Sequence, residues 1–237
     1  MAPTRPTMPA SRVFAVIPAR GGSKGLPGKN VALLAGKPLY RHSIDAALAA
    51  GITDIHVTTD MDEILQSPMP DGVTLHHRPD QLARDDTPMA AVLLDLLPAA
   101  GLTEGTLVLL QPTSPLRRPE TIRHGLELFA RSGASMVMSV SPAERSVLKW
   151  GLLDGQRFVP LVKPDYCFAN RQSLPEVVRP NGALYVFDAG RFLAAGDYGV
   201  EAIHVLPIAE DEAQDIDTAA DLARCSAILS NNGNTDA

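Results

Sequence analysis

Short apolar runs alternate with helical patterns through the first part of the chain. The runs predict buried strands at residues 13–17, 54–59, 73–76, 106–110 and 135–140. The helical patterns lie between some of them, at residues 38–50, 88–99 and 119–131. This alternation implies right-handed crossovers and a parallel sheet, so we predict an α/β fold.

The alternation breaks after Ser141. Residues 142–182 are rich in proline, charge and aromatic side chains, with short strand-like pieces at 147–152 and 157–161. We expect an inserted arm that projects from a core formed by residues 12–141 and 183–229. Because the arm has no evident core of its own, we expect a second copy of the chain to cover it, giving a homodimer.

The core is expected to resume with strands at residues 183–187 and 203–206 and to close with a helix at 218–229. Residues 1–11 carry three prolines and no apolar h-region, and residues 230–237 are mostly polar. We expect both ends to be disordered tails, and we do not expect a signal peptide.

Polar side chains follow the ends of four predicted strands. Arg20, Asp60, Arg78 and Gln111 each come just after such a strand. Open α/β sheets bind their ligands at the carboxyl ends of the strands. We therefore expect the functional site at this edge.

The loop after the first strand is mostly glycine, proline and cation, and residues 17–30 read IPARGGSKGLPGKN. Its glycines let backbone amides approach an anion without a Cβ in the way. Arg20, Lys24 and Lys29 add positive charge to an acidic chain. A strand that ends in such a loop is suited to hold a polyphosphate.

Two better-known phosphate loops do not fit this segment. Aligned with a Walker loop, Ser23 stands where the first glycine belongs and Asn30 where Ser or Thr should bind magnesium. The spacing of a dinucleotide fingerprint is missing too. A solvated glycine-rich turn is the remaining alternative, and the density of cations argues against it.

Composition narrows the class of partner. A net charge of −6 argues against a nucleic-acid-binding surface, and no apolar stretch approaches the length of a membrane span. Two cysteines, Cys167 and Cys225, are too few for a disulfide framework and are typical of reduced thiols in a cytoplasmic protein. The adjacent His76 and His77 point to opposite faces of a strand, which argues against a zinc site.

Six sequence blocks resemble one enzyme family, in its order, over roughly residues 12–229. They are the loop RGGSKGLPGKN, then RPDQLA with Asp86-Thr87, LQPTSPLR, RQSLP, RPNGALY and DIDT. The chain resembles the acylneuraminate cytidylyltransferases, which are CMP-nonulosonate synthetases. The resemblance implies a Rossmann-like nucleotide-diphospho-sugar transferase fold, with a mostly parallel central sheet flanked by helices and a small projecting dimerisation lobe at 142–182.

The implied reaction couples CTP to the anomeric hydroxyl of a nine-carbon 2-keto sugar acid and releases pyrophosphate. The acid would be N-acetylneuraminic acid or a legionaminic or pseudaminic relative, activated for cell-surface polysaccharide. Two alternatives stay open: the same fold using GTP or an eight-carbon acid of the KDO type, or a nonenzymatic nucleotide-binding protein. The last predicts erosion of the phosphate and metal positions, and both sets are intact here.

The family's nucleotide-binding positions carry over mainly to the loop. By resemblance they are Ala19, Arg20, Gly21, Gly22, Ser23, Lys24, Lys29, Asn30, Arg78 and Asp86. Arg20 and Lys24 are the expected catalytic clamps on the phosphates. Lys29 could instead be a surface lysine, and Arg78 could form a surface salt bridge.

Asp215 and Asp217 point to the same side of an extended segment. Two such carboxylates suit Mg²⁺, or Mn²⁺ as a substitute, with waters and substrate phosphate completing the shell. The alternative is an acidic start to the helix at Thr218. The resemblance favours the metal and adds Asp217 to the catalytic set, while no residue is an obvious general base.

The sugar acid needs cations of its own, because arginine can grip a carboxylate with two parallel bonds. By resemblance the sugar-acid pocket takes Gln111, Lys149, Arg171, Arg179, Asn181, Tyr185 and Phe187. In the family the arm brings such residues to the neighbouring subunit's site. For Phe187 a core position is an equally good interpretation, and Arg117 is expected to be structural.

Overall fold

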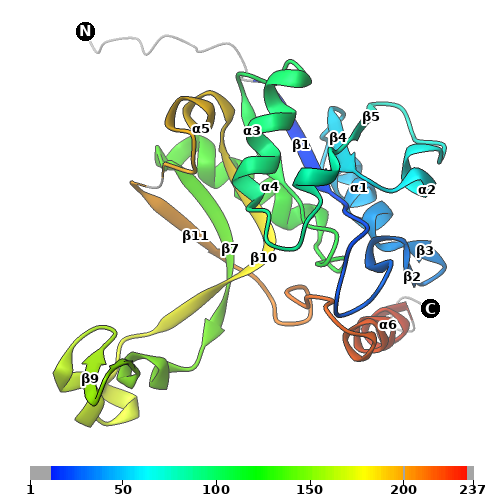
Figure 1. The fold of residues 1–237 in the computed structure, drawn as a ribbon. Coiled ribbons are helices and arrows are strands. Elements are labelled where there is room, and N and C mark those ends of the chain that lie inside the picture. Colours follow the sequence, from blue (N-terminus) through cyan, green and yellow to red (C-terminus); the bar gives the residue numbers. More distant parts are fainter. Residues whose placement is uncertain (1–11, 200, 234–237) are drawn as a thin grey trace, which may run out of the picture.

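The fold is built on one seven-stranded sheet (Figure 1). The structure is a computed structural model that describes residues 12–199 and 201–233. The strand order is β11-β7-β10-β6-β1-β4-β5, and β10 alone runs antiparallel to its neighbours. The strands are β1 Val13–Pro18, β4 Ile55–Thr59, β5 Val73–His77, β6 Thr106–Leu109, β7 Met136–Ala143, β10 Val177–Asp188 and β11 Ile203–Pro207.

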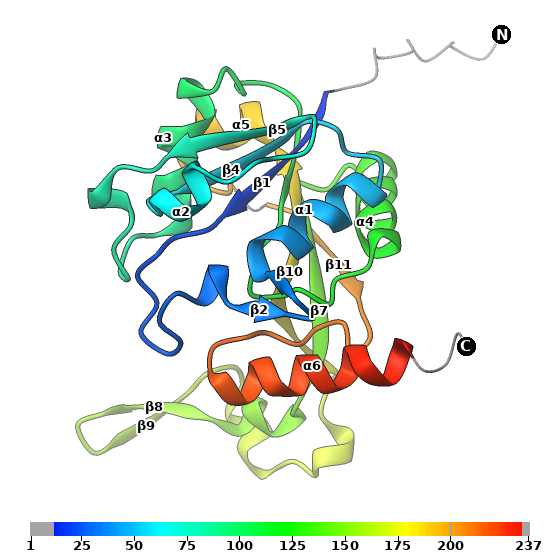
Figure 2. The ribbon, with the colours of Figure 1, turned by 90° about the vertical axis from the view of Figure 1, so that its right-hand side faces the viewer.

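Helices cover both faces of the sheet (Figure 2). The helices α1 Leu39–Ala49 and α4 Pro119–Ser132 pack against one face, and α3 Met89–Ala99 and α5 Ala189–Ala195 pack against the other. In β1, Phe14 and Val16 belong to one apolar cluster while Ala15 and Ile17 belong to the other. A strand buried on both faces reads as the continuous apolar run seen in the sequence.

Three smaller elements complete the core. The short helix α2 Asp62–Leu65 follows β4, and the two-residue strands β2 Leu33–Leu34 and β3 Lys37–Pro38 pair with each other. The last helix, α6 Ala219–Gly233, contacts β2. None of the helices in the described residues combines the length and the apolar character that a membrane span requires.

The predicted elements are confirmed with three differences. β10 begins six residues before the expected residue 183 and is antiparallel, because it returns from the arm beside β7 instead of through a crossover helix. Residues 147–149 lie in a 3₁₀ helix, Arg145–Lys149, because an apolar run without alternation does not distinguish strand from helix. The helix α6 ends at Gly233, so the first four residues of the tail expected at 230–237 are helical and that part of the prediction is wrong. Residues 234–237 and the tail expected at 1–11 lie outside the described residues.

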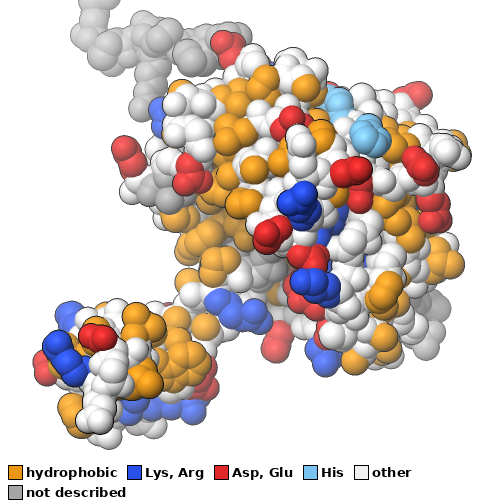
Figure 3. Space-filling view, in the orientation of Figure 1, with side chains coloured by type: hydrophobic (Ala, Val, Ile, Leu, Met, Phe, Trp, Pro, Cys, Tyr) orange, Lys and Arg blue, Asp and Glu red, His pale blue; other side chains and the backbone are white. Residues whose placement is uncertain are grey.

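The arm projects from one end of the β7–β10 ribbon (Figure 1). It holds the hairpin of β8 Gly151–Asp154 and β9 Arg157–Pro160 and two further 3₁₀ turns, Pro164–Phe168 and Arg171–Ser173. Figure 3 shows it as a lobe separate from the core, with apolar side chains on its surface. Trp150, Leu153 and Phe168 are 60%, 83% and 91% exposed, so the arm buries little of its own apolar surface.

Candidate active site

Polar side chains from three strand ends converge on one cavity of about 200 Å³, the loop cavity. Its polar lining residues are Arg20, Ser23, Lys29, Asn30, Arg78, Gln111 and Thr113. Arg20 follows β1, Arg78 follows β5 and Gln111 follows β6, so the expectation that strand-end residues meet at this edge is confirmed for three of the four. The fourth, Asp60, is not among the lining residues and accepts a hydrogen bond from the loop instead.

The glycine-rich loop is held to the sheet by hydrogen bonds. The Ala19 amide donates to the Thr58 carbonyl at 2.9 Å, and the Gly21 amide donates to Asp60 Oδ1 at 2.8 Å. The buried Asn30 donates from Nδ2 to the Arg20 carbonyl at 2.7 Å. Within the described residues nothing hydrogen-bonds to Asn30 Oδ1, so a residue that lines the loop cavity keeps one buried acceptor without a partner.

Two of the predicted phosphate cations meet on one carboxylate. Arg20 Nη1 lies 2.6 Å from Asp85 Oδ1, and Lys24 Nζ lies 2.9 Å from Asp85 Oδ2. Hydrogen bonds from Lys24 and Arg20 lower the pKa of Asp85 below its ordinary range. The carboxylate that meets these cations is therefore Asp85 and not the predicted Asp86, although both residues are exposed. The sequence shows two adjacent aspartates but does not indicate which of them pairs with the cations.

Arg78 is a buried cation and not the partner of a surface salt bridge. It is 3% exposed, and its Nη2 donates to the Thr58 carbonyl at 3.0 Å. Burial lowers its pKa to about 10, against the opposing effect of the Asp60 charge, so the guanidinium stays protonated at neutral pH. A buried positive charge that lines the loop cavity can bind an anionic or acceptor group.

Lys29 joins the loop to the two aspartates. Its Nζ lies 2.9 Å from Asp217 Oδ1, and its side chain is only 11% exposed, so it is not a free surface lysine. A Cβ on Gly25 would stand 2.4 Å from the Asp217 carbonyl oxygen, which shows how closely the two backbones pack. The buried Ile216 anchors the aspartate segment, and its amide donates to the Thr113 carbonyl at 2.8 Å.

The aspartate segment brings three carboxylates together, and Asp217 is the one paired with Lys29. Desolvation by the surrounding protein raises the pKa of Asp215, as do the charges of Asp217 and Asp221, against a hydrogen bond from Thr113 and the charge of Lys29. Within residues 12–199 and 201–233, no three acidic, histidine or cysteine side chains are arranged to hold a metal ion. The carboxylates of Asp215 and Asp217 are hard oxygen ligands that still fit Mg²⁺, which usually keeps waters and takes few protein ligands.

Asp221 also fixes where α6 begins. Its Oδ2 accepts hydrogen bonds from the Thr218 amide and hydroxyl at 2.9 and 2.7 Å, and its own amide donates to Thr218 Oγ1 at 3.3 Å. This reciprocal arrangement is a capping box, which ends the extended segment just after Asp217.

Two of the predicted sugar-acid residues, Gln111 and Asn181, lie at or near the loop cavity. Gly182 has φ +79°, and a Cβ there would stand 2.9 Å from Gln111 Oε1, so the RPNGA segment packs directly on the Gln111 amide. Asn181 is buried and bonded to two serines, accepting from Ser139 and donating to Ser141. Its amide therefore holds the strand bulge between Pro180 and Tyr185.

A polar cavity of about 350 Å³ lies beside this segment, lined by Arg179, Asn181, Gly182, Gln214, Asp215 and Arg224. Arg179 and Asp215 therefore line the same cavity. Arg117 stabilises the backbone beside these cavities. It is buried and donates to the backbone carbonyls of Gln111 and Ala183, which agrees with the structural role expected for it.

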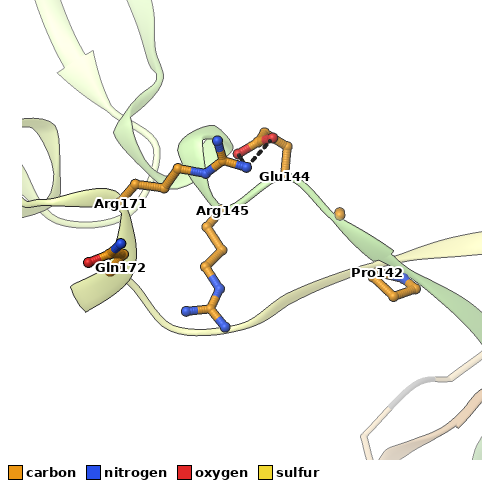
Figure 4. Close-up of a pocket in the computed structure, with 6 residues that line it drawn as sticks. Pro142, Glu144, Arg145, Arg171 and Gln172 are labelled. Carbon is orange, nitrogen blue, oxygen red and sulfur yellow. Dashed lines mark hydrogen bonds and ion pairs between the residues drawn. The ribbon is translucent and has the colours of Figure 1, made fainter.

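Lys149 and Arg171 lie in the arm, which projects away from the helices and strands of the core (Figure 1). Neither residue lines the loop cavity. Arg171 pairs with Glu144 at 2.8 Å on the rim of an arm cavity of about 500 Å³ (Figure 4). Within a single chain these two predicted sugar-acid residues are therefore not brought to the loop cavity.

Phe187 belongs to the core and not to a cavity wall. It is 1% exposed and packs against Phe192 and Tyr198, with ring centroids 5.5 and 5.6 Å apart. The prediction that it lines the sugar pocket is corrected, because Phe187 sits two residues further along β10 than Tyr185 and is covered by those two rings.

A further cavity beside the loop cavity was not predicted from the sequence. This apolar cavity of about 290 Å³ is lined by Met89, Leu109, Gln111, Met136, Tyr185, Asp197 and Tyr198. It shares Met89 and Gln111 with the loop cavity, so the two adjoin. Its lining residues come from separate elements and share no sequence motif. Gln111 and Tyr185 are the two of them that were predicted as site residues.

A glycine-rich cationic loop at the carboxyl edge of a mostly parallel sheet, facing a pair of aspartates, defines a nucleotide-binding α/β protein. The chain belongs to the cytidylyltransferase family, whose model matches residues 14–149. This confirms the resemblance seen in the six sequence blocks.

Relatives extend the match over most of the chain. A CMP-N,N'-diacetyllegionaminic acid synthase of Legionella pneumophila is 37% identical over 225 residues, covering 90% of this chain and 94% of that protein. An N-acylneuraminate cytidylyltransferase of Streptococcus agalactiae is 31% identical over 210 residues, and the match covers 87% of this chain but 50% of that protein. A pseudaminic acid cytidylyltransferase of Campylobacter jejuni is 26% identical, with 87% and 91% covered.

The fold has solved counterparts. A CMP:2-keto-3-deoxy-manno-octonic acid synthetase complexed with CTP matches with a TM-score of 0.71 at 19% identity, covering 94% of this chain and all of that one. A 4-diphosphocytidyl-2C-methyl-D-erythritol synthase matches with a TM-score of 0.65 at 13% identity. Identities this low show the fold alone, and the predicted Rossmann-like α/β class is confirmed.

Proposed function

We propose that the chain couples CTP to the anomeric hydroxyl of a nine-carbon 2-keto sugar acid, giving the CMP-sugar and pyrophosphate. Relatives named for legionaminic, acylneuraminic and pseudaminic acids support this substrate class. The observation that carries the proposal is the loop cavity, where Arg20, Asn30 and Arg78 face one space whose rim reaches the aspartate segment through Lys29. The eight-carbon alternative has support only from fold similarity.

The reaction is a displacement at phosphorus. The anomeric oxygen bonds to the α-phosphorus and its proton passes to solvent. The bond from that phosphorus to the bridging oxygen breaks, and pyrophosphate leaves with the bonding electron pair. Arg20 and Lys24 would exchange the Asp85 carboxylate for phosphate oxygens, because a carboxylate and a phosphate both present paired anionic oxygens to a cation. Such positioning and charge neutralisation supply most of the catalysis, and losing one contact costs about 3 kcal/mol, roughly a hundredfold in rate.

Asp215 and Asp217 would hold Mg²⁺, or Mn²⁺ in its place. When bound, the ion would neutralise charge on the phosphates beside the loop. The protein's own part is to hold these carboxylates against the loop, through Ile216, Lys29 and the close Gly25 contact.

We further propose a homodimer in which the arms exchange. The exposed Trp150, Leu153 and Phe168 give the arm an apolar surface that a second copy can cover. Lys149 and Arg171 would then reach the sugar-acid pocket of the other copy. Cys167 and Cys225 are both free, which supports a cytoplasmic location. Light scattering on Phe168→Asp should show monomers, and a wild-type protein that is monomeric at micromolar concentration would remove the exchange.

Pyrophosphate release tests the reaction, with magnesium, across four nucleoside triphosphates and a panel of eight- and nine-carbon acids. We expect release only with CTP and a nine-carbon acid. Asp217→Asn should lose about a hundredfold in kcat, while Glu210→Gln, which removes an exposed carboxylate from a nearby turn, should not. Near-normal turnover by Asp217→Asn would remove the metal assignment, and silence of the folded wild type on every pair would refute the reaction.

A further inference from the structure

We propose that the Lys29 ammonium group and the metal ion are alternative partners of the Asp217 carboxylate. Lys29 holds the carboxylate until the ion binds, and it is then released toward phosphate in the loop cavity. This exchange makes the binding of metal and the binding of nucleotide cooperative. The inference rests on the proposed function and deepens it, because it assigns Lys29 a part in coupling the proposed metal site to the proposed phosphate site.

The ammonium group takes an oxygen that a metal ion on Asp217 would use. Lys29 Nζ donates to Asp217 Oδ1 at 2.9 Å. Mg²⁺ binds carboxylate oxygens at about 2.1 Å, so the two cations would lie no more than about 5 Å apart on this oxygen. A single and a double positive charge repel each other at that distance. Repulsion therefore disfavours a carboxylate that holds both.

The backbone of Lys29 is fixed, while its side chain can turn. The Lys29 amide donates to the Leu26 carbonyl at 3.0 Å, and the Lys29 carbonyl accepts from the Ala32 amide at 3.0 Å. In the part of the chain that the structure describes, Asp217 is the one hydrogen-bond partner of Nζ, although an ammonium group has three donors. The flexible four-carbon stem lets this group move without moving the loop.

The loop cavity offers the released side chain a new partner. Lys29 lines this cavity together with Arg20 and Arg78. Its side chain is only 11% exposed, so water solvates the ammonium group poorly, and a cation in such a place needs an anion beside it. Phosphate in the loop cavity would supply that anion and leave Asp217 free for the ion. By linkage, metal and nucleotide then strengthen each other's binding by the same factor.

The other cations of the loop are held by a carboxylate too. Arg20 and Lys24 share Asp85, so each of the three predicted loop cations is paired with an aspartate of the chain. Asp85 takes the place of an anion, whereas Lys29 takes the place of a cation. A metal–nucleotide complex carries both replacements, so its binding leaves no loop cation unpaired.

Metal binding without nucleotide tests the exchange. Mn²⁺ affinity is measured by electron paramagnetic resonance at about 0.15 M salt, where charges more than about 8 Å apart are largely screened. Lys29→Met keeps the length of the side chain and removes its charge, so we expect it to bind Mn²⁺ about tenfold more tightly than the wild type. Adding Asp217→Asn to Lys29→Met should abolish this gain, which would place the ion on Asp217.

Lys24→Met is the matched control. It removes the same charge from the same loop, but Lys24 pairs with Asp85 and its side chain is 85% exposed. We therefore expect the Mn²⁺ affinity of this variant to equal that of the wild type. An equal gain in both lysine variants would overturn the exchange, because the effect would then be one of overall charge.

Lysine acylation, followed by mass spectrometry, measures the release of Lys29 without any variant. In the wild type without nucleotide, Mg²⁺ should raise the rate of Lys29 modification severalfold. Lys37, which pairs with Asp45, is the internal reference and should not respond. This measurement decides the question if Lys29→Met does not fold.

The outcomes separate this inference from the proposed reaction. Lys29→Met that binds Mn²⁺ no more tightly than the wild type would overturn the exchange, as would a Lys29 acylation rate that Mg²⁺ does not change. Neither measurement uses turnover, so such a result leaves the reaction standing. Failure of pyrophosphate release with every acid would instead refute the reaction, whatever the metal measurements show.

Discussion

Gly25→Ala tests whether the phosphate loop and the aspartate segment act as one unit. The added Cβ would lie 2.4 Å from the Asp217 carbonyl oxygen and 3.4 Å from its carbon. The neighbouring atom is backbone, so the two segments must separate by about 0.6–1 Å to restore ordinary contact. The ion pair between Lys29 and Asp217 would lengthen with them.

The expected effect falls on rate more than on stability. A displacement of about 1 Å in a catalytic group can cost roughly a hundredfold, equal to about 2.7 kcal/mol in the barrier. The Asp217 side chain is 70% exposed, so the segment can move outward and relieve the clash. We therefore expect Tm to fall by only a few degrees.

The assay is steady-state pyrophosphate release with CTP and the preferred acid, run beside thermal unfolding. Gly22→Ala is the folding control, because a Cβ there would lie 3.9 Å from the nearest atom, the Ala83 carbonyl oxygen, and Tm should not change. A Gly25→Ala protein with wild-type kcat and wild-type Tm would refute the coupling of loop and aspartates.

Three further predictions follow from the site and the sheet. Asp85→Asn should lower the KM for CTP severalfold at low ionic strength, because the substitution removes a carboxylate that competes with phosphate for Arg20 and Lys24. The effect should be smaller at high salt, which screens these charges. An unchanged KM would mean that Asp85 does not compete with phosphate. Arg117→Met should lower stability by about 3 kcal/mol, or roughly 6–12 °C in Tm, because the carbonyls of Gln111 and Ala183 lose their donor; an unchanged melting curve would contradict this. His56 Nδ1 lies 2.8 Å from His76 Nε2, and His56 Nε2 lies 2.9 Å from Asp54 Oδ1, in a neighbourhood that includes Arg12. Burial lowers the pKa of both histidines below the ordinary 6.5. As the pH falls, the unfolded chain therefore takes up protons before the folded chain does. The free energy of unfolding has its full value above about pH 6.5 and falls as the pH drops toward the pKa values of the folded state. Tm measured from pH 8 to 5 should show this slope, and His76→Gln should flatten it.

Much of the fold followed from local pattern. β1, α1 and the glycine-rich loop were predicted within about two residues, because burial on both faces and loop chemistry are written in adjacent positions. The convergence of Arg20, Arg78 and Gln111 also followed, since carboxyl ends of parallel strands share one edge.

The rest depends on contacts between distant segments. The insertion of β10 between β6 and β7 is a non-local pairing that no local period reveals. The choice of Asp85 over Asp86 depends on how one turn is oriented, and adjacent identical residues carry no signal for it. The apolar cavity was missed for the same reason, because Met89 and Met136 become neighbours of one space only after folding.

The central place of β10 in the sheet has a consequence for biosynthesis. β7 pairs only with β10 and β11 among the described strands, and both are made after it. While the ribosome has released only the first 150 or so residues, β6 keeps an apolar open edge and β7 has no neighbour, which is the kind of surface that aggregates. We therefore expect that the segment matched by the family model, residues 14–149, does not fold independently, and that a fragment cut there is insoluble until residues 177–188 are restored.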